Sequence, residues 1–239
     1  MKNWKTKSGY EIFRVLHGRS NAFLICTEKF NLLVDTGIIS AYDRLQRNIS
    51  TLNLPSNSID FLILTHSHYD HCQSVNVIQK QYNCKTIQSE NETEFTRLGY
   101  APLPDGTNLL TRLIANLGKN LGQKYFRFSP FIADILFNDQ LDLNSFGLNI
   151  RLIHTTGHSP GSISVIVDNE IALVGDAMFG IFRNSIFPPF ADDISGMIKS
   201  WGVLLKTECK VFLPGHGNEI SRALVQNEFD KFSQKPRYQ

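Results

Sequence analysis

The chain contains no apolar run of the length, about 20 residues, that a membrane-spanning helix needs. Its first thirteen residues, MKNWKTKSGYEIF, are basic, but they lack the apolar stretch of a secretory signal. These two absences exclude a membrane protein of the helical type. They lead us to expect a cytoplasmic protein with no membrane partner.

Cysteine is also scarce, and its spacing excludes a disulfide framework. Cys26, Cys72, Cys84 and Cys209 form no CxxC pair, and disulfides are rare in the reducing compartment expected here. We therefore predict four free thiols. Cys72 is expected to be a small buried side chain rather than a metal ligand or a nucleophile.

The chain has no strong excess of either charge, since 24 basic residues face 22 acidic ones and the formal net charge is +2. A protein that binds a nucleic-acid polymer usually carries a clear basic excess, so we expect no such partner. A length of 239 residues with 42% hydrophobic residues is sufficient for one large globular domain. We predict a single domain over residues 1–239.

Short apolar runs separated by turn residues predict a mixed α/β protein. Helical periodicity is present at 72–82 and 107–121, where Thr107 or Asn108 is available as the N-cap. A further helix is expected to start after Asp192 or Asp193, and another closes the chain. This order favours two sheets packed face to face with helices outside. The expected strands lie at 10–16, 22–26, 30–37, 59–64, 83–88, 149–155, 162–167, 171–176 and 210–213.

The stretch LTHSHYDHC at 64–72 places three histidines and an aspartate directly after an apolar run. On an extended backbone His66 and His68 point to the same side, so they can chelate one ion. Asp70 and His71 are adjacent and point in different directions. Two neighbouring metal ions would therefore use these four side chains better than one.

Three more potential ligands stand where later apolar strands end. His158 lies in TTGHSPGS, Asp176 in ALVGDAMFG and His216 in FLPGHGNE. A lone histidine or aspartate in a turn is more often a cap or a surface group than a ligand. Their occurrence together with the histidine cluster favours a metal site.

The motifs H-x-H-x-D-H, G-H-S-P-G, G-D and P-G-H-G, in this order, resemble those of the metallo-β-lactamase superfamily over nearly the whole chain. The resemblance implies a four-layered αββα sandwich. It also implies that Asp35, in NLLVDTG, positions a ligand or a loop without binding metal itself. The implied ligands are His66, His68 and His158 for a first ion, Asp70, His71 and His216 for a second, and Asp176 as the bridge between them.

Two metal ions of this kind activate a water molecule for hydrolysis. Zinc is the expected metal, with iron and manganese as alternatives. Asp70 is the candidate catalytic residue, since its carboxylate could orient the attacking water or accept its proton.

The segment at about 95–140 is rich in basic and aromatic residues. It resembles the variable insertion of the family and suggests a helical lid. Such a lid would favour a small anionic substrate with an apolar part. The alternative is that its leucine stripe is ordinary core or a homodimer contact. Phe179, Phe182 and Arg183 are further candidates for contacting the substrate.

The leading hypothesis is a hydrolase of a small ester, lactone or thioester. The metal motifs resemble those of hydroxyacylglutathione hydrolases and acyl-homoserine lactonases. Only 23 residues follow His216, and this short C-terminal part makes a thioester substrate less favoured. Two alternatives share the scaffold: a mononuclear iron oxidoreductase resembling persulfide dioxygenases, and a phosphodiesterase of small nucleotides. A binding protein that has lost catalysis is a third.

Overall fold

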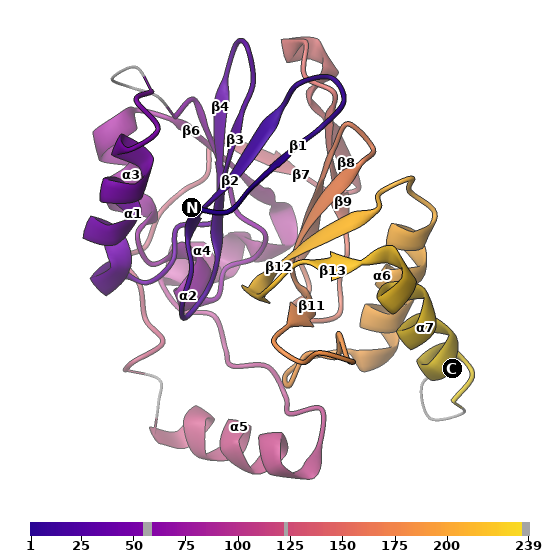
Figure 1. Cartoon of the computed structure of the whole chain (residues 1–239). Helices are drawn as coiled ribbons and strands as arrows, with labels where there is room; N and C mark the ends of the chain where they lie inside the picture. Colours follow the sequence, from indigo (N-terminus) through magenta and orange to yellow (C-terminus); the bar gives the residue numbers. More distant parts are fainter. Residues whose placement is uncertain (55–58, 122–123, 236–239) are drawn as a thin grey trace. The chain divides into compact units, whose positions relative to one another are not determined.

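The computed structural model describes residues 1–54, 59–121 and 124–235. The chain divides into two compact units, each built around one β-sheet (Figure 1). The first unit comprises residues 1–101 and 126–137, and the second comprises 102–125 and 138–239. The single domain expected over residues 1–239 stays a prediction. No helix in the described part of the chain is long and apolar enough to span a bilayer.

The first unit contains a seven-stranded sheet in the order β1 to β7. Its first four strands pair antiparallel, whereas β4 to β7 pair parallel, so the carboxyl ends of β4, β5 and β6 lie at one edge of the sheet. The strands are β1 (Asn3–Lys5), β2 (Glu11–Leu16), β3 (Ala22–Cys26), β4 (Asn31–Val34), β5 (Phe61–Ile63), β6 (Lys85–Ser89) and β7 (Ile135–Phe137).

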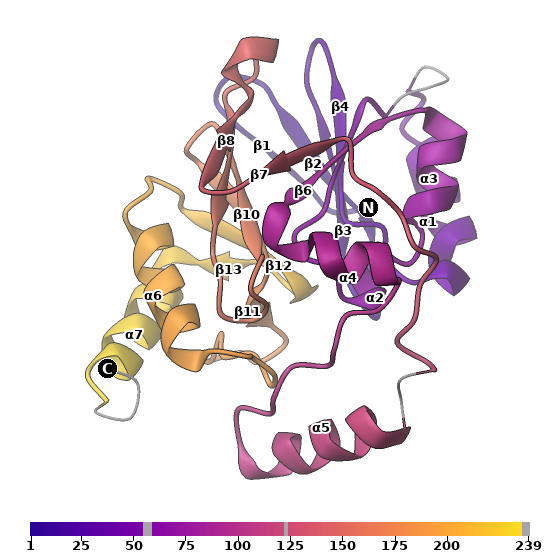
Figure 2. The ribbon, with the colours of Figure 1, turned by 180° about the vertical axis from the view of Figure 1, so that it is seen from behind.

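Helices pack on this sheet through apolar side chains that recur at helical spacing. Leu45 and Ile49 of α1 (Tyr42–Ser50), and Val75 and Ile78 of α3 (Val75–Tyr82), are buried in one hydrophobic cluster with the strands. Figures 1 and 2 agree in placing both helices on the same face of the sheet. The short helices α2 (Tyr69–Cys72) and α4 (Thr93–Leu98) follow β5 and β6.

The second unit contains a six-stranded sheet in the order β13, β12, β11, β10, β9, β8. Only the β11 and β12 pair is parallel. Asp168 and Asn169 both have positive φ, which is the geometry of a tight hairpin turn between β10 and β11. The strands are β8 (Gln140–Asp142), β9 (Ile150–His154), β10 (Ile163–Val167), β11 (Ile171–Gly180), β12 (Val211–Gly217) and β13 (Ile220–Ser221).

The core of the second unit forms under α6 (Ile194–Leu205) and α7 (Arg222–Ser233), which lie side by side (Figure 2). Trp201 is fully buried, and its indole N–H donates to the carbonyl of Ala177 at 2.6 Å. The side chain of Asp193 accepts a hydrogen bond from Gly196 N and so caps α6, which selects one of the two predicted caps.

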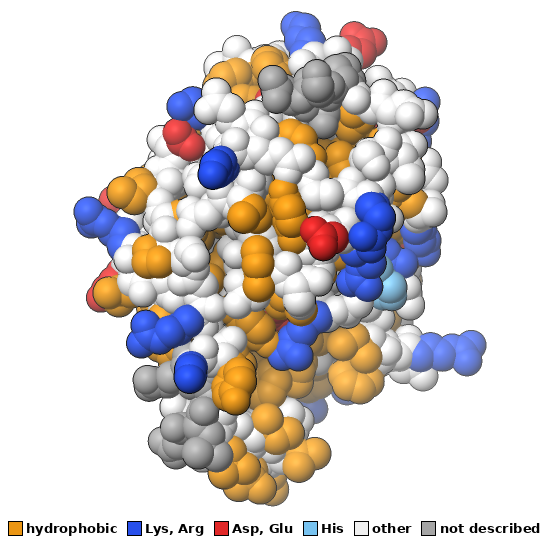
Figure 3. Space-filling view, turned by 90° about the vertical axis from the view of Figure 1, so that its left-hand side faces the viewer, with side chains coloured by type: hydrophobic (Ala, Val, Ile, Leu, Met, Phe, Trp, Pro, Cys, Tyr) orange, Lys and Arg blue, Asp and Glu red, His pale blue; other side chains and the backbone are white. Residues whose placement is uncertain are grey.

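The predicted helix at 107–121 is present as α5 (Leu109–Leu121), and Asn108 caps it by accepting from Thr111 N. Its apolar stripe is exposed: Leu110 retains 68% of its accessible surface and Leu113 58%. Figure 3 shows hydrophobic side chains gathered over this helix at the bottom of the view. The stripe is therefore not part of the core of the second unit.

All four cysteines have free thiols, as the sequence predicts. Burial raises the pKa of Cys26 and of Cys84 to about 11 each, and raises that of Cys72 well above its ordinary value. Cys72 lies in the hydrophobic cluster of the first unit. These environments suit small apolar side chains rather than reactive thiolates.

We expect iodoacetamide to alkylate native Cys26 and Cys84 slowly at pH 8 and about tenfold faster for each pH unit up to about pH 10, because the thiolate fraction rises in this way below the pKa. The folded pKa exceeds the unfolded value of 9.0, so the protonated thiols stabilise the fold below about pH 9 and lose this contribution toward pH 11. Mass spectrometry of timed samples measures the rates. Fast labelling of Cys84 in folded protein at pH 8 would contradict the burial described here.

Candidate metal centre

The first unit holds four of the seven predicted ligands on the segment that follows β5. This strand lies between two parallel neighbours, so the chain leaves it at the carboxyl edge of the sheet. The rings of His66 and His68 lie 4.6 Å apart between centroids, and those of His66 and His71 lie 4.2 Å apart. All three imidazoles are buried, whereas Asp70 is partly exposed.

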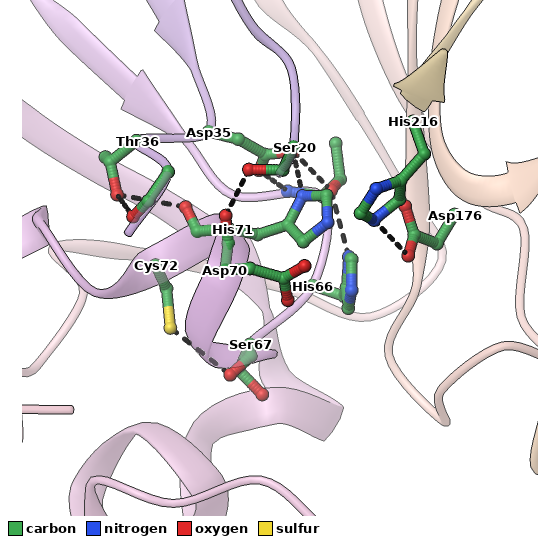
Figure 4. Close-up of polar contacts among 12 residues, drawn as sticks. Ser20, Asp35, Thr36, His66, Ser67, Asp70, His71, Cys72, Asp176 and His216 are labelled. Carbon is green, nitrogen blue, oxygen red and sulfur yellow. Dashed lines mark hydrogen bonds and ion pairs between the residues drawn. The ribbon is translucent and has the colours of Figure 1, made fainter. Parts of the chain in front are cut away.

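Asp35 connects the end of β4 to this histidine cluster (Figure 4). Its backbone has a φ of 61°, in the left-handed region that aspartate tolerates better than most residues. One carboxylate oxygen accepts from the backbone N–H of Thr65 at 2.8 Å. The other accepts from the Thr65 hydroxyl at 2.7 Å and lies 2.8 Å from Nδ1 of His71.

These contacts determine which nitrogen of each ring carries the proton. A carboxylate only accepts hydrogen bonds, so Nδ1 of His71 must be the donor to Asp35. The Thr65 hydroxyl gives its only proton to Asp35, so its oxygen accepts from Nδ1 of His66 at 3.1 Å. In both rings Nε2 is thereby left with a lone pair that can bind a metal ion.

The backbone around Asp70 and His71 is held by hydroxyl groups that sequence reasoning missed. Thr36 binds the carbonyl of His71 through its backbone N–H at 2.7 Å and its hydroxyl at 2.9 Å. Ser20 donates its hydroxyl to the carbonyl of Asp70 (Figure 4). Serine and threonine are too common in turns for the sequence to single these two out.

Glu92 is a second group that the sequence analysis missed. It is buried beside the end of β6, and its carboxylate accepts from both the backbone N–H and the hydroxyl of Ser67, between the first two histidines. A signal for it was available, because it follows a predicted strand closely in sequence. Charged residues just beyond parallel strand ends are candidates for supporting a site.

The second unit holds the other three predicted ligands. One oxygen of Asp176, Oδ2, lies 3.4 Å from Nε2 of His158 and 3.2 Å from Nε2 of His216. The pairing of β11 with β12 shifts register between Gly175 and Phe179, so Asp176 sits in an irregular stretch of strand. Such irregularities redirect side chains at functional sites. The result is a carboxylate oxygen that faces two imidazoles. Figure 4 shows the one that belongs to His216.

His158 is held in its turn by the segment that leads into α6. Its Nδ1 lies 2.9 Å from the carbonyl of Phe190, which can only accept, so Nε2 is again left with its lone pair. Gly157, directly before it, has a φ of +124°, and a Cβ there would lie 2.2 Å from the backbone nitrogen of Met197. Only glycine allows this close approach of the turn to α6.

The three candidate substrate-binding residues differ in their surroundings. Phe179 is buried and stacks on His216 with ring centroids 4.5 Å apart and an interplanar angle of 28°. That contact supports the imidazole of a predicted metal ligand. Phe182 and Arg183 are exposed. Their contact with a substrate stays a prediction.

The side chains of the candidate ligands, in the first unit and in the second, have the chemistry that divalent metal ions bind. Imidazole nitrogen with carboxylate oxygen is the combination that zinc accepts in catalytic sites, and iron and manganese accept it too. Within the first unit, the ligand atoms of His66 and His68 lie within 4.8 Å of each other, and so do those of Asp70 and His71. Each pair is close enough to share one ion.

The model of the metallo-beta-lactamase superfamily matches residues 16–216 of the chain. The chain belongs to this superfamily. It is 29% identical over 160 residues to a "Probable metallo-hydrolase" of Methanocaldococcus jannaschii, covering 67% of this chain and 68% of the relative. It is 26% identical over 213 residues to a protein of the same description from Bacillus subtilis, covering 88% and 90%.

Solved structures show the same fold. A metallo-beta-lactamase family protein of Thermus thermophilus superposes with a TM-score of 0.67 at 19% identity, over 92% of this chain and 77% of that one. A subclass B3 metallo-beta-lactamase of Bradyrhizobium japonicum gives a TM-score of 0.64 at 17% identity, over 93% and 90%. The predicted α/β class and metallo-β-lactamase fold are confirmed.

Replacing Asp35 by asparagine should weaken metal binding by about 10- to 100-fold, the usual effect of removing a group that orients a ligand. The amide would donate its N–H to Nδ1 of His71, which favours the tautomer whose ring proton is on Nε2, the nitrogen needed for the metal ion. Metal affinity measured by competition with a chelator tests this. Asp60→Asn is the matched control, because Asp60 accepts from Asn31 N at the opposite end of β4. Equal affinity in the two variants would contradict the role of Asp35.

Gly157→Ala should lower the free energy of unfolding by about 2 to 4 kcal/mol, since it adds a backbone clash to an unfavourable φ. Gly9→Ala is its control, because Gly9 also has a positive φ, +98°, but nothing lies within 4 Å of a Cβ there. The Gly9→Ala variant should lose about 1 kcal/mol of the free energy of unfolding. Urea denaturation measures both. Equal losses would mean that the approach to Met197 does not constrain the turn.

Proposed function

We propose that this protein is a hydrolase that uses two divalent metal ions, with zinc as the expected metal, to cleave a small ester, lactone or thioester. His66, His68 and His158 would hold one ion, and Asp70, His71 and His216 the other. Asp176 would contact both.

The observation that carries the proposal is the fixed protonation of three buried histidines. His66, His71 and His158 each have Nδ1 tied to an oxygen, which leaves Nε2 with its lone pair. Buried histidines in an ordinary core have no need of three such arrangements at strand ends. The relatives named as metallo-hydrolases support the same interpretation.

When bound, the ions would lower the pKa of a water molecule and polarise the substrate's carbonyl oxygen. The carboxylate of Asp70, which is partly exposed, would accept a proton from the attacking water or orient it. Asp35 and Thr65 would keep His71 and His66 in the metal-binding tautomer throughout the reaction. Phe190, through its carbonyl, would do the same for His158.

The test is metal analysis of the purified protein combined with hydrolysis assays on ester, lactone, thioester and phosphodiester substrates. We expect two metal ions per chain and turnover without oxygen. His158→Ala should lose at least one ion, and its turnover should fall by about 1,000-fold or more, because the remaining groups cannot activate water alone.

His17→Ala is the matched control, since His17 is exposed and contacts Asn21 rather than any predicted ligand. It should retain both metal and activity. Unchanged metal content and turnover in His158→Ala would contradict the proposed ligand set. One iron per chain with oxygen consumption would instead favour the dioxygenase alternative.

A further inference from the structure

The first unit contains a pocket of about 380 Å³ between the β2–β3 turn and the start of α1. Arg19 and Arg44 both line it, together with the hydroxyl residues Ser20 and Ser40. Leu16 and Ile38 add an apolar wall. A concave site with two guanidinium groups has the chemistry of an anion-binding site.

In the part of the chain that the structure describes, the charges of Arg19 and Arg44 are not paired with a carboxylate. Among residues 1–54, 59–121 and 124–235, neither Arg19 nor Arg44 forms an ion pair with an aspartate or glutamate. Arginine presents its donors in a planar fork that matches carboxylate and phosphate oxygens. The pocket therefore offers a ligand two guanidinium groups whose charges are not paired with a carboxylate.

The positions of both guanidinium groups are restricted by their neighbours. Arg19 donates to the hydroxyl of Tyr69 and lies over its ring, 5.3 Å from the centroid. Gly18 has a φ of +146°, and a Cβ on it would lie 3.1 Å from Nη2 of Arg44. The absence of a side chain there lets the Arg44 guanidinium approach the backbone of the turn.

The pocket adjoins the segment that carries the predicted metal ligands. Tyr69, which holds Arg19, stands between His68 and Asp70 in the sequence. Ser20, on the pocket wall, donates to the carbonyl of Asp70 (Figure 4). A substrate whose anionic group binds in the pocket could therefore also reach the Asp70 loop.

We propose that Arg19 and Arg44 bind an anionic group of the substrate, a carboxylate or a phosphate, remote from the bond that is cleaved. This inference rests on the proposed hydrolase function. It names two specificity residues that lie outside the 95–140 segment. The enzyme would then prefer esters or lactones that end in a negative charge.

The test compares two p-nitrophenyl esters of equal length, the glutarate monoester and the valerate, of which only the first ends in a carboxylate. We expect wild type to have a kcat/KM about tenfold higher for the glutarate ester at low salt, the effect of one good charge-assisted contact. Arg44→Gln and Arg19→Gln should each remove most of this preference by raising KM, with kcat nearly unchanged. Salt at about 0.5 M should reduce the preference for the glutarate ester, because both arginines are exposed and salt screens exposed charges.

Arg47→Gln is the matched control, since Arg47 is an exposed residue of the same helix that does not line the pocket. It should keep the preference of wild type. If Arg47→Gln and Arg44→Gln reduce the preference equally, general charge rather than the pocket is responsible, and the inference fails. Equal kcat/KM for the two esters in wild type would overturn it as well.

A binding measurement separates failure of this inference from failure of the hydrolase proposal. Glutarate and, separately, inorganic phosphate are titrated into the metal-loaded, ¹⁵N-labelled protein. Saturable shifts of the Gly18, Arg19 and Ser20 amides in wild type, lost in Arg44→Gln, would support the pocket even if no ester is cleaved. The probe with the lower Kd identifies the group as carboxylate or phosphate. No shift with either probe overturns the inference, whatever the enzyme hydrolyses.

Discussion

The first half of the candidate site depends on the hydrogen bonds of one buried carboxylate, that of Asp35. A buried carboxylate is costly unless its oxygens accept several hydrogen bonds. Asp35 accepts from the backbone and hydroxyl of Thr65 and from His71, so its burial, its left-handed backbone and the orientation of two imidazoles are coupled. Because it connects the ends of β4 and β5, the sheet itself sets the distance between this carboxylate and the histidines.

The second unit achieves the same control of a histidine with different groups. Here a backbone carbonyl, that of Phe190, takes the place of the carboxylate, and the turn before His158 depends on a glycine packed against α6. Asp176 is directed by an irregularity in strand pairing rather than by a turn. The two units thus reach equivalent imidazole states from unrelated local structures, which is consistent with ligand chemistry being the shared requirement.

Much of this arrangement could be predicted from the sequence because it depends on local pattern. The strands, the Asp193 cap and the hairpin at Asp168 and Asn169 follow from periodicity and turn chemistry, and the structure contains them. The predicted ends of β11 and β12 are wrong, because these strands continue to Gly180 and Gly217 and so include Asp176 and His216. The seven candidate ligands stand out because histidine and aspartate close to the ends of apolar runs are rare together. Thr65 does not stand out, because its role depends on contacts that only the folded chain creates. Strands β7 and β8 are three residues each, too short for a periodic signal.

The sequence predicts that the basic residues of the 95–140 segment attract an anionic substrate, and the structure favours a different place. Three of the basic residues in the 95–140 segment are engaged locally: Arg112 donates to the carbonyl of Gly106, Lys119 pairs with Asp105, and Arg127 lies over the ring of Tyr100. A cation already paired with a carboxylate contributes little net attraction to a third charge. Within the described residues Arg19 and Arg44 have no such carboxylate, so their pocket offers an anion more net positive charge than Lys119 of α5 does.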